Sequence, residues 1–237
     1  MKNLIYRLGI YIIGVISVSL GIVLCVKCEL GVSPISSVPY VLGYLTPLTF
    51  GTLTMLFHFC NSMIQYILEK KLINAKVLLQ IPVAFLFGII IDFFKNIMSF
   101  NAEDMIFKIF LMIMSIVCTA LGMHLMLSMK LVQNPPDGTV NILARLLNIN
   151  IGTIKIYYDI FMVIISVILG IAFLHDLKGF GIATILSAIF VGKTLTVMKI
   201  GRKKRGSTFQ SSPVGSSSFL RQDTKIPPVV SFGRYFV

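Results

Sequence analysis

Long apolar stretches with few or no charged side chains dominate the sequence. Residues 8–26 and 50–68 contain no Lys, Arg, Asp or Glu. A hydrocarbon core about 30 Å thick needs roughly 20 helical residues to cross it, and backbone amides in lipid need internal partners. We therefore predict an all-α integral membrane protein with six transmembrane helices, at residues 8–26, 50–68, 77–94, 106–127, 152–174 and 179–198.

The composition agrees with this prediction. Of the 237 residues, 56% are hydrophobic and only 13% are charged, whereas soluble domains carry about 25% charged residues. A soluble enzyme and a disordered chain are both excluded. Lys2 and Arg7 precede the first apolar stretch as in a signal peptide, but no small-residue cleavage site follows, so we predict a retained helix.

Basic residues set the expected orientation, because cytoplasmic loops are rich in Lys and Arg. With the N-terminus in the cytoplasm, only Lys27, Lys95, Lys108 and Lys178 fall outside. Both termini are therefore expected to be cytoplasmic. The net charge of +12 lies mostly at cytoplasmic helix ends and in residues 200–237, which carry seven basic residues and one acidic residue. We expect this Ser-, Gly- and Pro-rich tail to be disordered, and we predict no nucleic-acid partner.

The two halves of the chain superpose when the sequence is shifted by 101 residues. Leu20-Gly21 falls on Leu121-Gly122, Pro34 on Pro135, and Phe50-Gly51-Thr52 on Ile151-Gly152-Thr153. A constant register over tens of residues indicates an internal repeat. Each copy holds three spans, so the second copy enters the membrane from the opposite side. We predict two inverted repeats, residues 1–101 and 102–199, a plan that recurs in secondary transporters.

Each repeat is interrupted after its first span. Ser33-Pro34 and Asn134-Pro135 both resemble a helix N-cap followed by proline at the first helical position. The apolar segments that follow, at 38–45 and 139–147, are too short to span. They are either re-entrant half-helices, whose N-terminal amides would offer partial positive charge to an anionic group, or helices on the membrane surface. Hydropathy alone leaves both open.

Several of these motifs resemble the YczE/YitT-like bacterial membrane proteins. The resemblance covers residues 4–198 and is carried by Arg7-Leu8-Gly9, Leu30-Gly31-Val32-Ser33-Pro34, Phe50-Gly51-Thr52, Leu79-Gln80-Ile81-Pro82 and Pro135-Pro136-Asp137-Gly138. It implies a multi-span protein of the bacterial inner membrane, and it supplies no catalytic residue. The tail after residue 200 departs from the pattern.

Polar side chains within the spans are the candidate functional groups, because they are costly in lipid. His58, Asn61 and Gln65 share one face of the second span, and Asp159 occupies the position equivalent to His58 in the fifth. These faces either line one cavity, as a ligand or proton path, or form a polar interface that locks the helices together. Asp159 and Lys193, at similar depth, could neutralise each other.

Other intramembrane residues are given structural roles. Asp92 is expected to pair with Lys95 at the membrane interface or to form an outer gate, and Lys155 to snorkel to the surface. Glycines are expected to permit close helix packing or to act as hinges, at Gly21, Gly51, Gly88, Gly122, Gly152 and Gly192.

Three motifs do not support a chemical site. Ser187 to Thr194 ends in Gly-Lys-Thr like a phosphate-binding loop, but it lies within an apolar span. Cys25 and Cys28 have redox-motif spacing without the surrounding fold, and His58 and His124 lack partners at zinc spacing. We predict no metal, no cofactor and no enzymatic activity.

The leading hypothesis is a secondary transporter or exporter of a small molecule, with proton coupling as one mode. The predicted substrate path comprises Ser33, Ser36, His58, Asn61, Asn134, Asp137, Asp159 and Lys193. Two alternatives stay open: an accessory membrane protein that stabilises or recruits a partner, and a substrate-binding subunit of an ATPase-driven transporter. The expected partners are the lipid bilayer and an unidentified solute, and homo-oligomerisation is left open.

Overall fold

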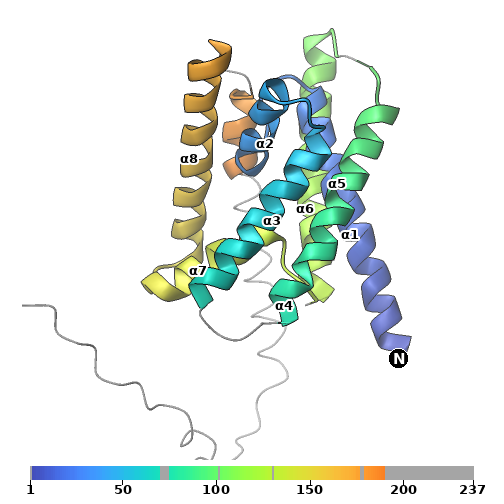
Figure 1. Ribbon diagram of the computed structural model, residues 1–237. Helices are drawn as coiled ribbons and strands as arrows, with labels where there is room; N and C mark the ends of the chain where they lie inside the picture. The colour runs from blue at the N-terminus through green and yellow to red at the C-terminus, as the bar shows by residue number, and fades with distance from the viewer. Residues whose placement is uncertain (1, 70–74, 101, 130, 177–178, 190–237) are drawn as a thin grey trace, which may run out of the picture. The chain divides into compact units, whose positions relative to one another are not determined.

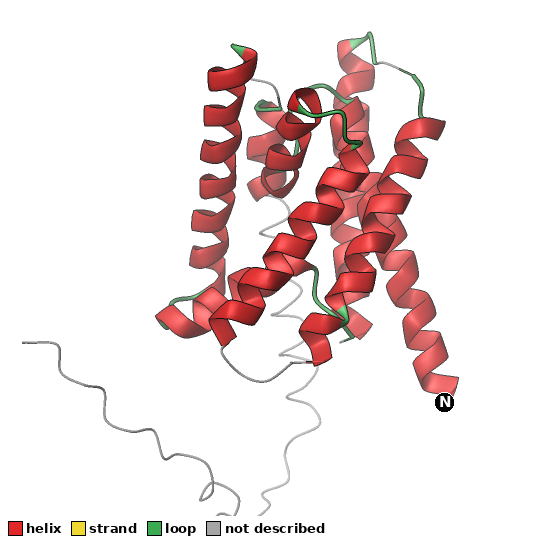
Figure 2. Ribbon diagram, viewed as in Figure 1, coloured by secondary structure: helices red, strands yellow, loops and turns green. Residues whose placement is uncertain are grey.

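The computed structural model describes residues 2–69, 75–100, 102–129, 131–176 and 179–189, which belong to one compact unit, Met1–Ile200. All regular secondary structure in these residues is helical (Figure 2). The helices are α1 (Lys2–Lys27), α2 (Pro34–Leu45), α3 (Phe50–Glu69), α4 (Ala75–Leu78), α5 (Gln80–Ile97), α6 (Met105–Met129), α7 (Pro135–Leu147) and α8 (Ile151–Leu169). A π-helical turn, η1 (Gly170–Leu174), extends α8, and residues 182–189 are also helical.

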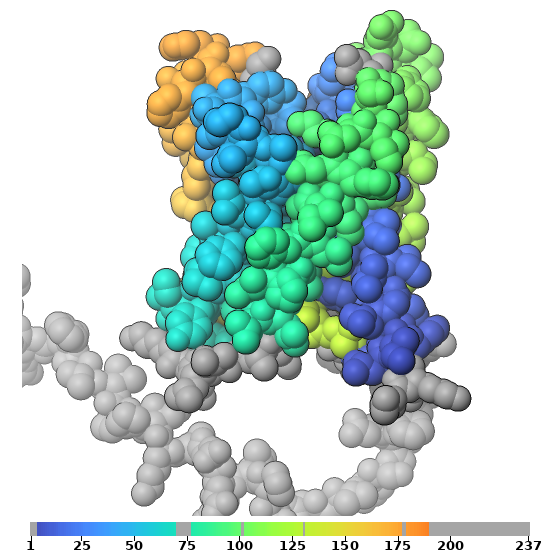
Figure 3. Space-filling model, turned by 45° about the vertical axis from the view of Figure 1, so that its right-hand side comes forward, coloured from blue at the N-terminus to red at the C-terminus, as the bar shows by residue number. Residues whose placement is uncertain are grey.

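Successive long helices run in alternate directions through the bundle (Figure 1). The N-terminus of α1, the short α4 and α7 lie at one end, and α2 lies towards the other end. The long helix pairs in contact are α1 with α6, α3 with α5, and α1 with α5, and Figure 3 shows α3 and α5 side by side. The short helices pack across this arrangement, α2 against α8 and α7 against α3.

Four described helical segments are long and apolar enough to cross a membrane: Leu4–Lys27, Gln80–Ile97, Met105–Met129 and Ile151–Leu174. They coincide with the first, third, fourth and fifth predicted spans. The second predicted span corresponds to α3, which has 20 residues but is not among these four segments. His58, Asn61 and Gln65 lower its mean hydropathy. The predicted sixth span, 179–198, lies partly outside the described residues, and so does the 200–237 tail.

Large apolar side chains lie on the outer surface of the bundle, and several polar side chains lie inside it. Ile106, Phe110, Ile113, Val117 and Leu121 form an exposed stripe along α6, and isoleucines at four-residue intervals form another on α8. His58, Asn61, Gln65, Lys155 and Asp159 are at least nine-tenths buried. Apolar surface outside and polar groups inside are typical of a helical bundle in lipid.

Candidate functional site

A small cavity is bounded by α1, α3, α6 and α8, by the last described helix, and by the N-terminal ends of α2 and α7. Its volume is about 60 Å³. The lining residues are Val18, Ile22, Ser33, Pro34, Ile35, Ser36, Thr54, His58, Thr119, Met123, Asn134, Lys155, Asp159, Ser187 and Ala188. Of the predicted substrate-path residues, the cavity brings together Ser33, Ser36, His58, Asn134 and Asp159.

Ten of the lining residues form five pairs separated by the 101-residue repeat offset. The pairs are Val18 with Thr119, Ile22 with Met123, Ser33 with Asn134, Thr54 with Lys155, and His58 with Asp159. Both halves of the chain therefore contribute corresponding positions to one cavity. The chemistry of the paired positions differs, since the second half supplies both of the charged side chains that line the cavity.

The short helices meet the cavity at their N-termini. Ser33 and Asn134 are the N-cap residues of α2 and α7, each followed by proline, but neither side chain caps a backbone N–H of its helix. The Ser33 hydroxyl instead donates to Ser36 Oγ at 3.0 Å. Because proline has no N–H, the first turn offers fewer backbone donors for a cap, and the polar side chains face the cavity.

Lys155 is a cavity residue, and the prediction that it snorkels to the surface is wrong. It is 9% exposed, and its Nζ lies 2.8 Å from Asp159 Oδ1 and 3.6 Å from Asp137 Oδ1. Asp137, in the first turn of α7, is outside the cavity lining. Burying an ammonium in the membrane is costly unless it is paired, and here carboxylates on α7 and α8 pair with it.

His58 has no comparable partner. Its ring packs edge-on against Phe87, with the ring centroids 5.2 Å apart, and the residue is 2% exposed. Its Nδ1 has no hydrogen-bond partner among the described residues, and neither does Asn134 Oδ1. Buried polar atoms are nearly always hydrogen-bonded to protein or water. These two atoms, both on cavity residues, therefore mark the cavity as a place where a polar ligand or water belongs.

The rest of the polar face of α3 holds α7 in place. Asn61 Oδ1 accepts hydrogen bonds from Thr139 Oγ1 at 3.0 Å and from the Tyr158 hydroxyl at 2.7 Å. Gln65 Nε2 donates to Pro135 O at 2.7 Å, and the Gln65 and Gln80 amides bond to each other at 3.0 Å in both directions. Asn61 thus lies outside the cavity lining, in a structural polar interface.

For Asp92, the predicted ion pair with Lys95 is replaced by contacts to the start of α3. Its Oδ1 accepts from the Gly51 N–H at 2.8 Å, and its Oδ2 accepts from the Thr49 hydroxyl, so it stabilises the N-terminus of α3. An ion pair with Lys95 is not among its contacts in the described structure. Lys193 and Gly192, predicted on the substrate path and at a packing position, lie outside the described residues.

Four of the predicted glycines lie at close helix contacts. A Cβ on Gly51 would come within 2.2 Å of Gly88 O, and one on Gly88 within 2.8 Å of Gly51 O. On the α1–α6 crossing, a Cβ on Gly21 would come within 2.8 Å of Thr119 N, and one on Gly122 within 2.6 Å of Gly14 O. Gly152 has only its neighbour Asn150 nearby, at 3.4 Å.

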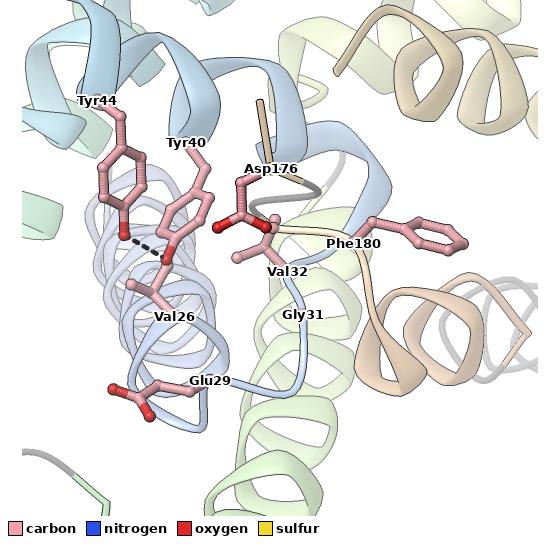
Figure 4. Close-up of a pocket in the computed structure, with 9 residues that line it drawn as sticks. Val26, Glu29, Gly31, Val32, Tyr40, Tyr44, Asp176 and Phe180 are labelled. Atoms are coloured by element: carbon pink, nitrogen blue, oxygen red, sulfur yellow. Dashed lines mark hydrogen bonds between the residues drawn. The ribbon is translucent and has the colours of Figure 1, made fainter. Parts of the chain in front are cut away.

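A larger cavity, about 300 Å³, lies at the end of the bundle where α1 finishes. Figure 4 shows Tyr40 and Tyr44 side by side, joined by a 2.8 Å hydrogen bond, with Asp176 beside Tyr40. Glu29, at its edge, pairs with Lys108 at 2.9 Å. Gly31 and Val32 line this cavity, while Ser33 and Pro34 line the small one. We call residues 31–34, which pass from one lining to the other, the partition.

Backbone hydrogen bonds hold this partition to the segment that precedes the last described helix. Val32 N donates to Gly179 O, and Ala183 N donates to Leu30 O, both at 2.9 Å. Gly31 adopts φ +113°, a conformation that favours glycine.

No group of three or more His, Cys, Asp or Glu side chains is placed to hold a metal ion in the part of the chain described. Cys25 and Cys28 are both buried, and their thiols contact the carbonyls of Gly31 and Cys25.

Comparison with known proteins adds one finding. Residues 5–200 match a family described as "Family of unknown function (DUF6198)". The chain belongs to the DUF6198 family. The match takes in every residue that lines the small cavity, from Val18 to Ala188, and ends where the basic tail begins. No curated protein and no solved structure matches the chain, so an activity for this DUF6198 protein has to be inferred from the site itself.

The sequence contained a signal for the residues that were missed. Thr54 and Lys155 fall on each other under the 101-residue shift, one turn before the His58 and Asp159 pair on the same helices. Applying the same offset one helical turn before His58 and Asp159 would have placed Lys155 at the site.

Proposed function

We propose that the protein is a secondary transporter of a small solute, with the small cavity as its substrate site. The observation that carries this proposal is the set of five repeat-related pairs in the cavity lining. A binding site at the interface of two inverted repeats is a recurrent feature of secondary transporters, in which one repeat moves against the other around the site.

The contact between α1 and α6 supports an inverted arrangement of residues 1–101 and 102–199. Gly21 packs against Ser115 and Thr119, while Gly122 packs against Gly14 and Val18. Subtracting 101 from 122 gives 21, and subtracting it from 115 and 119 gives 14 and 18. The two contacts therefore correspond to each other when the repeats are exchanged. Ser17 and Cys118, themselves 101 residues apart, touch through a 2.8 Å hydrogen bond from Ser17 Oγ to Cys118 O. Such reciprocity is what a two-fold axis through an antiparallel helix pair would produce.

The short helices fit the same symmetry. Helix α2 of the first half packs on α8 of the second, and α7 of the second half packs on α3 of the first. Their N-terminal prolines are buried: Pro34 on α2, and Pro135 and Pro136, which are fully buried, on α7. We infer that both are re-entrant half-helices rather than helices on the membrane surface.

The two sides of the cavity differ in how firmly they are closed. On the α7 side, Asn61, Gln65, Gln80 and Thr139 form a connected set of hydrogen bonds. On the α2 side, residues 31–34 lie between the two linings and are held to the following segment by two backbone hydrogen bonds, Val32 N to Gly179 O and Ala183 N to Leu30 O. The α2 side is therefore the side expected to open first. With cytoplasmic termini, as the basic residues predict, it faces out of the cell.

Solute flux across liposome membranes tests the proposal. Purified protein would be reconstituted with an internal pH-sensitive dye and exposed to small organic anions, inorganic anions, amino acids and amphiphilic amines. We expect saturable solute movement with wild type, lost in Asp159→Asn and retained in the matched control Ser37→Ala, which alters a buried hydroxyl outside the cavity. A dye response to the solute would establish proton coupling.

Two results would favour the accessory alternatives instead. One is co-purification of a stoichiometric membrane partner together with unchanged solute flux on deletion. The other is dependence of flux on a co-purifying ATPase, which would make the chain a binding subunit. The bacterial inner membrane as its location follows from the resemblance to the YczE/YitT-like proteins, and fractionation of the native host would test it.

A further inference from the structure

We infer that the small cavity binds a small monovalent anion with few non-hydrogen atoms, of the size of chloride, nitrate or formate. This inference rests on the proposed function, because it names the substrate class of the same site. Three features carry it: an uncompensated helix N-terminus, an unpartnered buried histidine, and a lining whose one carboxylate is paired with its one ammonium.

The N-terminus of α2 is the uncompensated positive end at the cavity. This 12-residue helix has no acidic residue in its first turn and no side-chain cap. Pro34 has no N–H, and Ser36 N already donates to Ser33 O at 2.9 Å, which leaves Ile35 N without a described backbone acceptor. Ile35 and Ser36 both line the cavity. The free Ile35 amide and the positive end of the helix dipole together favour an anion.

His58 supplies a second, independent indication. It is 2% exposed, lines the same cavity, and has an Nδ1 without a hydrogen-bond partner in the described residues. Neutral imidazole in the Nδ1–H tautomer donates one hydrogen bond there, and imidazolium also donates there. Ser36 adds a hydroxyl proton, since its oxygen accepts from Ser33 and no acceptor for its own hydrogen is described.

The acceptor groups nearby do not favour a cation. Asp159, the carboxylate in the lining, pairs with Lys155 at 2.8 Å, while Asp137, 3.6 Å from the same Nζ, lies outside the lining. The α7 N-terminus also differs from that of α2, because it begins with two prolines and carries Asp137 in its first turn. Asn134 Oδ1 is an unpartnered acceptor, but a turn of the amide group puts its N–H donors at the same place.

The size of the cavity limits the ligand. A volume of about 60 Å³ is well below the roughly 300–1,000 Å³ of sites for drug-sized molecules. It accommodates an ion or a few water molecules. A small anion fits the donors and the space together, whereas an amphiphilic drug fits neither.

Equilibrium dialysis of the purified full chain in detergent, with ¹⁴C-labelled formate as the probe, tests this inference without requiring transport. We expect saturable binding that chloride and nitrate displace and that gluconate, which is too large, does not. His58→Leu and Ser36→Ala are each expected to weaken formate binding about tenfold, because each removes a hydrogen bond to a charged ligand. His58→Asn, which keeps a donor near the Nδ1 position, is expected to retain binding within about threefold of wild type.

Ser37→Ala is the matched control for Ser36→Ala. Its hydroxyl is the next one along α2, donates to Pro34 O at 2.7 Å, and lies outside the cavity lining. We expect formate binding by this variant within twofold of wild type. Each variant would first be checked for a monodisperse elution profile and wild-type helix content.

Absence of saturable formate binding by folded wild type would overturn the inference, and so would equal binding by wild type and His58→Leu. Binding that needs sodium and is indifferent to the anion would point to a cation site and overturn it as well. Anion binding without flux in liposomes would uphold this inference while rejecting transport. Flux of a solute that is not an anion, with no formate binding, would uphold transport and reject the anion site.

Discussion

Lys155 illustrates at the residue scale how a charged side chain is kept inside the bundle. It is buried, and it pairs with one carboxylate on its own helix and another on α7. Removing one partner of a buried pair leaves an uncompensated charge, which costs more than the pair contributes. The contact with Asp137 links α7 to α8.

We expect Lys155→Met to lower the free energy of unfolding by about 3–5 kcal/mol, because Asp159 would then be left charged and buried. The double variant Lys155→Met/Asp159→Leu should recover much of this loss. Thermal unfolding of both variants in the same detergent measures the difference. An unchanged melting temperature in Lys155→Met would mean that the ammonium is solvated rather than paired.

Gly31 provides a second prediction at this scale. Its φ of +113° disfavours any side chain, and a Cβ would come within 2.7 Å of Gly181 N. We expect Gly31→Ala to destabilise the protein by about 1–3 kcal/mol and to alter access to the small cavity, since residue 31 lies in the partition.

Gly43→Ala is the control for this substitution, because Gly43 lies in α2 with only Leu53 Cδ1 nearby, at 3.7 Å. It should be neutral or stabilise the protein by up to about 1 kcal/mol through helix propensity. Equal melting temperatures for the two alanine variants would contradict the strain attributed to Gly31.

The sequence identified unusual residues but could not identify their contact partners. Polarity in an apolar run identified His58 and Asp159 as unusual, and the repeat offset related them to each other. The partners depended on the packing of distant segments: Asp92 lies near Lys95 in sequence, but its contacts are Thr49 and Gly51, at the start of another helix. Hydropathy also placed Lys155 near a surface because it counts residues along one helix and ignores the neighbouring α7.

At the scale of helices, close packing in the bundle occurs at glycines. The α1–α6 pair is close enough that a Cβ on Gly21 would lie 2.8 Å from Thr119 N and 2.9 Å from Ser115 O, both backbone atoms that cannot rotate away. In lipid, association of helices depends on such close packing because there is no hydrophobic drive between them.

Gly21→Ala is therefore expected to separate α1 from α6 and to cost about 1–3 kcal/mol of stability. Gly9→Ala, on the same helix with nothing within 4 Å, should leave the melting temperature within experimental error of wild type. Because alanine has the higher helix propensity, a comparable loss in both variants would show that an effect other than packing at Gly21 explains the result.

Element boundaries were better predicted than element roles. The four apolar helices match predicted spans closely, since length and hydropathy are properties of one segment. The short helices were ambiguous, because their burial depends on α3 and α8, which supply the surfaces they pack on. Only the arrangement of these helices shows that both N-termini reach one cavity.

At the scale of the whole molecule, the proposed inverted repeat makes a topological prediction. Leu48 and Ile149 are equivalent under the 101-residue shift, and both are exposed just beyond α2 and α7. In a background lacking the four native cysteines, Leu48→Cys and Ile149→Cys should react with a membrane-impermeant maleimide from opposite faces of sealed vesicles. Reaction of both from one face would reject the inversion and most of the argument for transport.

The contact between Ser17 and Cys118 has a further, evolutionary consequence under the proposed inverted arrangement. A contact between equivalent positions is one that two identical half-length chains, inserted in opposite orientations, could make with each other. Such an ancestor would have had the same side chain at both members of every cavity pair. Fusion into one polypeptide removes that restriction. Threonine can then lie at the position that corresponds to lysine, and histidine at the one that corresponds to aspartate. A chemically one-sided cavity is thus something that a fused gene can encode and a pair of identical subunits cannot.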